Sequence, residues 1–284
     1  MQDLINKIIH DDCFNIFPKI CDKSIDLILS DLPYGVTTRN KWDSILPLDL
    51  LWKEYSRILK DNGVIVLTSQ GMFSAQLMMT ATVKYKYSMV WRKQNVTNYL
   101  NAHKQPLRKH EDILVFYNNQ PAYNPQGLRR KMSVTRMGKT STTNYGEQKR
   151  DSYFQEYTHY PNTIINVKTA TTRRHPTEKP VNLFEYLIKT FTNKEMLVLD
   201  NCSGSGTTAI AARKSKRNFI CIEKEQTYCD TAQKRLEEFN LNNKELKLFD
   251  INKVPNINNS ISSLFSINKV IGFLSNFLNK YIIN

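Results

Sequence analysis

The sequence predicts an α/β fold with a mostly parallel, mixed sheet and helices on both faces. Short apolar runs, such as SIDLILS (24–30) and VIVLTS (64–69), have the continuous hydrophobicity of strands buried on both faces. Segments with helical periodicity, such as 48–60 and 181–192, separate these runs. Residues 196–223 have the pattern of a strand, a glycine-rich turn, a helix and a second strand, which is the unit that joins parallel strands.

The turn after the first apolar run, DLPYG (31–35), has unusual chemistry. Proline fixes φ and donates no hydrogen bond, so the turn is stiff and its carbonyls point outward. A carboxylate and a backbone carbonyl can accept the two hydrogens of a flat amino group, and the Tyr34 ring can stack on that group. The alternative is an ordinary connection at the end of a strand.

Helix and strand patterns alternate after this turn. The helix at 48–60 is expected to end at Asp61-Asn62-Gly63, and residues 72–83 predict a second helix. Residues 86–93 and 111–118 predict two further strands.

The middle of the chain lacks this regularity. Residues 118–160 show little periodicity and are rich in Gly, Asn, Ser, Thr and Arg, which predicts an irregular insertion. A strand at 163–167 then returns to the core, and residues 227–240 form the last predicted core helix. Beyond Asn240 the tail is rich in Asn and Ile and suggests no chemistry.

The glycine-rich turn indicates a nucleoside ligand. Gly204 and Gly206 allow a ligand to approach the backbone closely, and Thr207 and Thr208 begin the helix. Glu223, at the end of the next strand, follows Gly204 by 19 residues, the spacing of the acidic residue that holds ribose hydroxyls in nucleotide-binding folds. The turn is neither GxGxxG nor a P-loop, so an adenosine ligand without pyrophosphate fits better, and S-adenosylmethionine is the obvious candidate.

Together these segments resemble the amino-methyltransferases of DNA. DLPYG is similar to their D-P-P-Y catalytic turn, and residues 200–208 (DNCSGSGTT) are similar to their D-x-F-x-G-S-G-T-T cofactor motif. HPTEKP (175–180) resembles their H-P-x-x-K-P segment, and DDC (11–13) resembles their G-D-C segment. The four motifs follow the order of the permuted β group, over about residues 4–240.

The resemblance implies a Rossmann-like, S-adenosylmethionine-dependent methyltransferase fold with circularly permuted motif order, from a phage or a restriction–modification system. It divides the chain into a catalytic half (1–91), a target-recognition insertion with returning core strands (92–170), a cofactor-binding half (171–240) and a tail of unknown role (241–284). Two departures stand out, because Leu32 replaces the first proline of the catalytic turn and Asn201-Cys202 replaces the usual Pro-Phe. Neither removes a group that the reaction requires.

The resemblance also implies roles for individual residues. The catalytic residues are Asp31, Leu32, Pro33 and Tyr34. The cofactor-binding residues are Asp12, Cys13, Asp31, Thr177, Lys179, Asp200, Cys202, Gly204, Ser205, Gly206, Thr207, Thr208 and Glu223. Within this set Asp12 is expected at the adenine amino group, Glu223 at the ribose and Thr177 or Lys179 near the methionine carboxylate, whereas His175 is more often structural in such a segment.

The charge of the chain indicates a polyanionic partner. The formal net charge is +14, and residues 86–180 hold 17 Lys or Arg against 6 Asp or Glu, interleaved with tyrosines. We interpret this region as a surface for double-stranded DNA that becomes ordered on binding; a merely solvated lysine-rich loop is the alternative. The residues expected to contact DNA are Trp42, Arg92, Lys93, Arg108, Arg129, Arg130, Lys131, Arg136, Arg173 and Arg174.

The predicted function is transfer of a methyl group to the exocyclic amino group of a flipped-out base, adenine before cytosine. The chain has no Pro-Cys dipeptide, which excludes methylation at carbon-5 of cytosine. Methylation of RNA or of a protein glutamine amide would place the cofactor motif first, and this chain reverses that order. A non-catalytic DNA-binding module derived from a methyltransferase is the alternative of another class.

Composition sets further expectations. The five cysteines form no CxxC pair and have no metal-ligand spacing, so we expect reduced thiols, no metal and a cytoplasmic protein. No apolar run has the length of a membrane span, and the N-terminus is not a signal peptide. A homodimer and a cognate restriction endonuclease are partners that the resemblance leaves open.

Overall fold

The computed structural model describes residues 1–35, 44–136, 152–168 and 178–248. The chain divides into two units, Met1–Phe239 and Asn240–Asn284, and the fold below is that of the first unit. No helix in the described ranges is long and apolar enough to cross a membrane.

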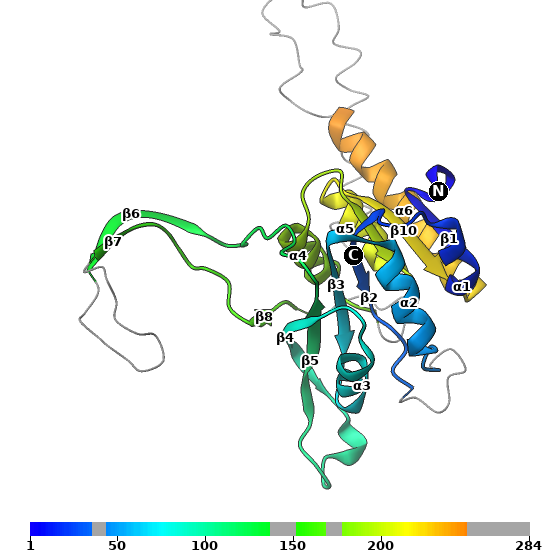
Figure 1. Ribbon diagram of the computed structural model, residues 1–284, viewed down its shortest axis with the longest axis horizontal. Helices are drawn as coiled ribbons and strands as arrows, with labels where there is room; N and C mark the ends of the chain where they lie inside the picture. The colour runs from blue at the N-terminus through cyan, green and yellow to red at the C-terminus, as the bar shows by residue number, and fades with distance from the viewer. Residues whose placement is uncertain (36–43, 137–151, 169–177, 249–284) are drawn as a thin grey trace, which may run out of the picture. The chain divides into compact units, whose positions relative to one another are not determined.

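An eight-stranded mixed sheet forms the centre of the unit (Figure 1). Across the sheet its strands are β1 (Lys7–His10), β10 (Asn218–Glu223), β9 (Leu197–Asp200), β2 (Ile25–Ser30), β3 (Leu59–Ser69), β5 (Arg108–Phe116), β4 (Tyr85–Thr97) and β8 (Ile164–Asn166). The first five are parallel, β5 is antiparallel to both β3 and β4, and β4 is parallel to β8. The predicted mixed sheet is confirmed.

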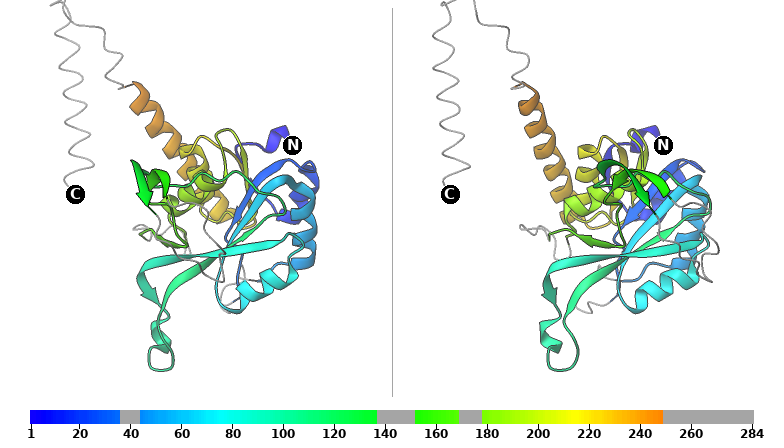
Figure 2. Two further views of the ribbon diagram at one scale, coloured as in Figure 1. Left: turned by 60° about the vertical axis from the view of Figure 1, so that its left-hand side comes forward. Right: turned by 90° about the vertical axis from the view of Figure 1, so that its left-hand side faces the viewer.

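Helices cover both faces of the sheet, as Figure 2 shows from two directions. One face packs against α1 (Cys13–Ile16), α2 (Leu48–Ile58) and α3 (Met72–Thr80), and the other against α4 (Val181–Phe191), α5 (Thr207–Lys214) and the first turns of α6 (Gln226–Leu248). Short 3-10 helices are η1 (Gln2–Leu4), η2 (Phe17–Lys19) and η3 (Tyr99–Asn101). Alternate strand residues serve the two cores: Val64 and Val66 of β3 face the α4 side, whereas Ile65 and Leu67 face the α2 side.

The parallel strands bring the predicted motifs to one edge of the sheet. β2 pairs with β9, and β10 pairs with β9 and β1, all in parallel. Carboxyl ends of parallel strands meet at the same edge of a sheet. Asp200 and Glu223 end their strands at this edge, and Asp31 and Asp12 come just after theirs. Segments from the two ends of the chain therefore build one region.

The structure revises two details of the secondary structure. Helix α2 ends at Ile58, and Asp61-Asn62-Gly63 lies inside β3, which begins at Leu59 because buried Leu59 already pairs with Ile25. The insertion, expected to be irregular, contains an antiparallel pair, β6 (Arg129–Arg136) and β7 (Ser152–Thr158). Backbone hydrogen bonds join these two strands, and their large apolar side chains Met132, Val134 and Phe154 are exposed.

Candidate active site

The carboxylate of Asp31 is surrounded by hydrogen-bond donors at the end of β2. Its Oδ1 accepts from the Tyr34 hydroxyl at 2.9 Å and from the Thr68 hydroxyl, which comes from the end of β3. Its Oδ2 accepts from Lys179 Nζ at 2.7 Å. The side chain of Asp31 keeps 19% of its surface exposed, so the carboxylate is oriented from within the protein and still reachable from outside.

The rest of the catalytic turn is anchored in the core. Leu32 is buried in the α2-side core, which accounts for an apolar residue where the family has proline. The Tyr34 ring packs at 5.3 Å on the ring of Phe73, and Lys179 Nζ lies over the Tyr34 ring, 5.7 Å from its centroid. Burial and the charge of Asp31 raise the pKa of Tyr34, so its hydroxyl stays protonated and donates to Asp31.

Four charged groups form a chain that leads inward from Asp31. Lys179 Nζ is 2.7 Å from Asp31 Oδ2 and 3.2 Å from Glu111 Oε2, and Lys93 Nζ is 3.1 Å from Glu111 Oε1. Burial opposes the charge of Lys179, but Asp31 and Glu111 outweigh it and raise the Lys179 pKa. Burial likewise opposes the charge of Glu111, but Lys179 and Lys93 outweigh it and lower the Glu111 pKa. The network therefore alternates in sign, and its neighbouring charges favour the charged forms of Lys179 and Glu111.

This network corrects one sequence expectation and adds to another. Lys93 was expected on the DNA-binding surface, but it is 7% exposed and its ammonium pairs with Glu111. Lys179 was expected near the methionine carboxylate, which stays a prediction, and the structure adds that it is 7% exposed and pairs with Asp31. A buried lysine needs anionic partners, and these two partners come from other strands, which no local pattern reveals.

The glycine-rich turn has the backbone geometry that glycine permits. Gly204 has φ 50° and Gly206 has φ 79°, both in the left-handed region. A Cβ on Gly206 would lie 2.7 Å from the Cβ of Ala232. The close packing of helix α6 therefore requires glycine at position 206, and the expected approach of a ligand stays a prediction. Gly204 N donates to Glu223 Oε2 at 2.7 Å, so this glycine does lie beside the expected ribose-binding carboxylate.

Asp200 joins the catalytic strand to the glycine-rich turn. Its Oδ1 accepts from the Ser30 hydroxyl at 2.9 Å and from Cys202 N at 3.1 Å, and its Oδ2 accepts from the Thr208 hydroxyl. Asp200 is 2% exposed, and burial raises its pKa to about 7. Both oxygens of Asp200 are hydrogen-bonded inside the protein, so this residue fixes the glycine-rich turn. Its expected contact with the cofactor stays a prediction.

Other residues of the turn also bond inward. Thr207 Oγ1 donates to the Lys179 carbonyl at 3.2 Å, and Arg235 donates to the carbonyl of buried Ser205 at 3.1 Å. The Thr207 bond ties the turn to the residue that holds Asp31. The two predicted motifs are thereby connected through the backbone as well as through side chains.

A buried hydrogen-bond network explains the Asn201-Cys202 departure. Asn201 is 3% exposed and accepts from the Tyr55 hydroxyl of α2 at 2.5 Å. Its Nδ2 lies 3.9 Å from the sulfur of Cys13 and 3.5 Å from the sulfur of Cys202. The polar side chain is therefore satisfied where the family has proline and phenylalanine, and both cysteines expected near the cofactor border it.

The chemistry of this edge fits a nucleoside. Glu223 is 8% exposed, and burial raises its pKa. Asp12 caps α1 by accepting from Phe14 N at 3.0 Å, and its other oxygen lies 3.0 Å from Lys224 Nζ. The buried Ser203 hydroxyl has no hydrogen-bond partner among the residues that the structure describes. Two carboxylates on neighbouring strand ends and a free hydroxyl match the donors and acceptors of a ribose and an adenine.

Apart from the buried Lys93, the expected DNA-binding residues divide into three groups. Exposed residues are Arg92, Arg108, Arg129, Arg130 and Lys131, of which Lys131 donates to Gln155 across the β6–β7 pair at 2.7 Å. Arg136 is described only by its backbone at the end of β6. Trp42, Arg173 and Arg174 lie outside the described residues, as does Thr177 of the cofactor set.

Four residues of the site were missed in the sequence: Ser30, Thr68, Glu111 and Ser203. Ser30 and Thr68 end or nearly end the two strands beside the catalytic turn, so the rule of strand carboxyl ends could have indicated them. Ser203 lies within the quoted glycine-rich turn. Glu111 carries no local signal, because its role depends on two lysines from other segments.

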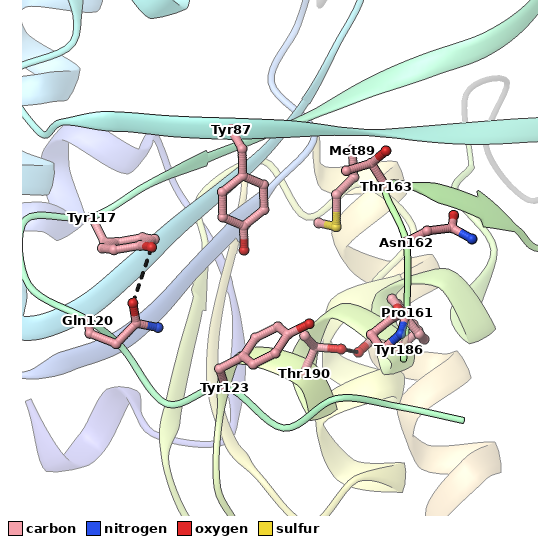
Figure 3. Close-up of a pocket in the computed structure, with 10 residues that line it drawn as sticks. All are labelled: Tyr87, Met89, Tyr117, Gln120, Tyr123, Pro161, Asn162, Thr163, Tyr186 and Thr190. Carbon is pink, nitrogen blue, oxygen red and sulfur yellow. Dashed lines mark hydrogen bonds between the residues drawn. The ribbon is translucent and has the colours of Figure 1, made fainter. Parts of the chain in front are cut away.

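A hollow lies away from this edge, on the α4 side of the sheet (Figure 3). It has a volume of about 320 Å³, and Figure 3 shows the rings of Tyr87, Tyr117 and Tyr123 beside it. In the sheet, Tyr87 of β4 pairs with Val115 of β5. Ser69, the last residue of β3, pairs with Asp112, which is three residues away from Val115 along β5. Of the expected catalytic and cofactor residues that the structure describes, none lines it.

The sequence is similar to those of known DNA methyltransferases. The sequence profile of the N6_N4_Mtase family, described as DNA methylase, matches residues 25–234. Type II methyltransferase M.HinfI from Haemophilus influenzae is 26% identical over 90% of this chain and 75% of its own length. DNA adenine methyltransferase YhdJ from Escherichia coli is 27% identical over 81% of this chain and 82% of its own.

Solved structures share the fold. The M1.HpyAVI complex with S-adenosylmethionine superimposes with a TM-score of 0.56 at 24% identity, covering 81% of this chain and 99% of the other. The cytosine-N4-specific PvuII DNA methyltransferase superimposes with a TM-score of 0.59 at 14% identity, covering 84% and 92%. The profile match spans well over half of the chain and includes both the catalytic turn and the glycine-rich turn. The chain thus belongs to the N6_N4_Mtase family of DNA methylases, amino-methyltransferases of the restriction–modification type that use S-adenosylmethionine.

Proposed function

We propose that this protein methylates the exocyclic amino group of a flipped-out adenine in double-stranded DNA. The observation that supports this best is the Asp31 carboxylate, which is oriented by three donors and stands beside the cofactor turn through the Ser30–Asp200 hydrogen bond. The family establishes a DNA amino-methyltransferase, and the choice of base is our proposal.

The exocyclic nitrogen of a base is a poor nucleophile because its lone pair is delocalised into the ring. The Asp31 carboxylate and the Leu32 carbonyl would accept its two N–H bonds and localise that lone pair. When bound, S-adenosylmethionine would supply a methyl group from a positively charged sulfur, which would keep the electron pair of the broken C–S bond. Asp31 then stabilises the positive charge that develops on the nitrogen until a proton leaves along the N–H bond toward Asp31 and from there to water.

The side chains of the turn would also hold the base. Flipping costs a few kcal/mol of unstacking, and stacking on an aromatic ring returns about 1–3 kcal/mol. Tyr34 is suited to this role because its ring is fixed by Phe73 and its hydroxyl by Asp31. The cofactor would be held by Glu223, Asp12 and the Ser203 hydroxyl.

Two features favour adenine over cytosine. An aspartate at the head of the turn leans toward adenine in this family, and the relative YhdJ is named as a DNA adenine methyltransferase. Cytosine N4 is the second candidate, because the PvuII enzyme of the same fold is cytosine-N4-specific and both bases present the same kind of amino group. A homodimer and a cognate endonuclease stay predictions.

The test is to express the protein in a host that lacks DNA methylation and to sequence the host DNA with modified-base detection. We expect 6-methyladenine at one short sequence, and none from the Asp31→Ala variant. Detection of 4-methylcytosine would assign the second candidate. Unmodified DNA, from a protein that binds S-adenosylmethionine in calorimetry, would favour the non-catalytic module.

A further inference from the structure

We propose that Lys179 is a latch: its ammonium occupies the place of the target amine on Asp31, and it moves onto Glu111 when the base enters. This inference rests on the proposed function, because it concerns how the same carboxylate is made available. Lys179 and Glu111 are positioning residues in this scheme, since neither contacts the reacting nitrogen in it.

The contacts of Asp31 leave little room for a substrate. A carboxylate has about four acceptor positions, and three donors already bind this one. Two of these donors, the hydroxyls of Tyr34 and Thr68, share Oδ1, whereas Oδ2 is bound by Lys179 at 2.7 Å. The one acceptor position that stays open is also on Oδ2, so an incoming amine must share this oxygen with Lys179 or displace it.

The ammonium of Lys179 also resembles the target nitrogen that would replace it on Asp31. Its ammonium is a tetrahedral, positively charged nitrogen that donates to Asp31, as the target nitrogen does while the methyl group is transferred. The same Nζ lies over the Tyr34 ring, 5.7 Å from its centroid, on the side chain proposed to stack with the base. One movement of Lys179 would free both the carboxylate oxygen and that ring.

Glu111 is placed to receive the ammonium. Its Oε2 is already 3.2 Å from Lys179 Nζ, and its Oε1 is fixed by Lys93 at 3.1 Å. Lysine is a flexible cation with three donors, so a small shift exchanges one carboxylate for the other. Lys179, Glu111 and Lys93 remain paired throughout, and Asp31 keeps its hydrogen bonds from Tyr34 and Thr68.

The transfer onto Glu111 also serves the chemistry. A second positive charge on Asp31 would oppose the positive charge that develops on the target nitrogen. With Lys179 drawn toward Glu111, the carboxylate of Asp31 is available to one cation only. The competing view is that the network is a fixed ion pair that merely supports the HPTEKP segment.

Two substitutions separate these views. Glu111→Gln keeps the shape but removes the charge that attracts Lys179, so the latch stays closed. We expect kcat/KM for DNA to fall by about tenfold, in the range of couplings between contacting residues, with S-adenosylmethionine affinity unchanged. Adding Lys179→Met to Glu111→Gln removes the blocking cation, so the double variant should be more active than Glu111→Gln alone.

An ion pair outside the site provides the control. Glu185 and Lys189 pair on α4 at 2.5 Å, Glu185 also pairs with Lys214 at 2.6 Å, and none of these residues belongs to the site. Glu185→Gln, Lys189→Met and their combination should all retain wild-type kinetics. Thermal unfolding and S-adenosylmethionine binding are measured for every variant to confirm folding.

The outcomes are distinct. Rescue of Glu111→Gln by Lys179→Met supports the latch, and a double variant that folds but is no more active than Glu111→Gln overturns it. If the double variant does not fold, Glu111→Gln decides alone: a raised KM for DNA at unchanged cofactor affinity supports the latch, and wild-type kinetics overturn it. A folded wild-type protein that binds S-adenosylmethionine but transfers no methyl group to DNA overturns the proposed function together with the latch.

Discussion

The catalytic edge and the β6–β7 hairpin both contain many charged side chains, but the charges are arranged differently. At the catalytic edge Lys93 and Lys179 are buried, and each pairs with a carboxylate at 3.1 Å or less. On the hairpin Arg129 and Arg130 are exposed to solvent. The basic residues of segment 86–180 thus differ in burial. The buried lysines position a carboxylate, whereas the exposed arginines can contact a phosphate.

This comparison is tested most severely at Asp31. Asp31→Ala should lower methyl transfer by at least about 10²–10³-fold, the cost of removing a group that stabilises developing charge. Cofactor affinity should change little, because Asp31 acts on the target amine. Radiolabelled methyl transfer and calorimetry measure the two properties. Tyr34→Phe keeps the ring and should be impaired far less than Tyr34→Ala; full activity in Asp31→Ala would refute the mechanism.

Glu223 tests the cofactor side of the same edge. Glu223→Ala should weaken S-adenosylmethionine binding by about 1–3 kcal/mol, the range for hydrogen bonds to a charged group. Calorimetry without DNA measures this effect. Glu225→Ala removes an exposed carboxylate two residues away and should bind like the wild type. Equal affinities for all three proteins would remove Glu223 from the binding site.

Asp200 tests whether burial sets the charge at this edge. Burial raises its pKa from 3.8 to about 7, so the folded protein holds this proton more tightly than the unfolded chain does. The free energy of unfolding should therefore fall as the pH rises through this window, by up to about 1.4 kcal/mol per pH unit. Asp200→Asn should remove this contribution, whereas Asp49→Asn on the exposed side of α2 should not. Urea unfolding at pH 5 and pH 7.5 measures it, and a constant difference between wild type and Asp200→Asn would contradict it.

The hairpin should give the smallest effect for each residue. If Arg129 or Arg130 contacts phosphate, its change to Ala should weaken binding to all DNA sequences alike and reduce the slope of log affinity against log salt by about one. If it reads a base, the loss should be about 1–3 kcal/mol at one position of the site only. Arg213→Ala, an exposed residue in the last turn of α5, is the control. Unchanged affinity, slope and site preference in both hairpin variants would show that the DNA surface lies elsewhere.

The sequence predicted the elements whose evidence is local. The apolar run before Asp31, the glycine pattern and the spacing to Glu223 each involve one short segment, and each predicted strand end lies at the same edge in the structure. The β6–β7 pair was not predicted, because backbone hydrogen bonds join two segments whose large apolar side chains are exposed rather than packed in a core.

The lysines show where local evidence was insufficient. Lys93 is in phase with buried Met89 and Trp91 along β4, so strand periodicity alone could have indicated that it faces inward. The partner of Lys179 could not have been predicted in this way, because Asp31 is 148 residues away in the chain. Gly206 is a similar case, since its steric requirement comes from Ala232 on a later helix.

The order of strands in the sheet has a consequence for synthesis. β1 and β2 leave the ribosome first, yet β10 and β9 lie between them in the finished sheet. The edges of β1 and β2 that later pair with β10 and β9 therefore stay unpaired while most of the chain is translated. Such late, long-range pairing slows folding and makes a nascent chain prone to aggregate. The Ser30–Asp200 bond joins residues that are 170 positions apart, so an incomplete chain cannot assemble the site. We expect methylation of DNA to begin only after β10 has been translated.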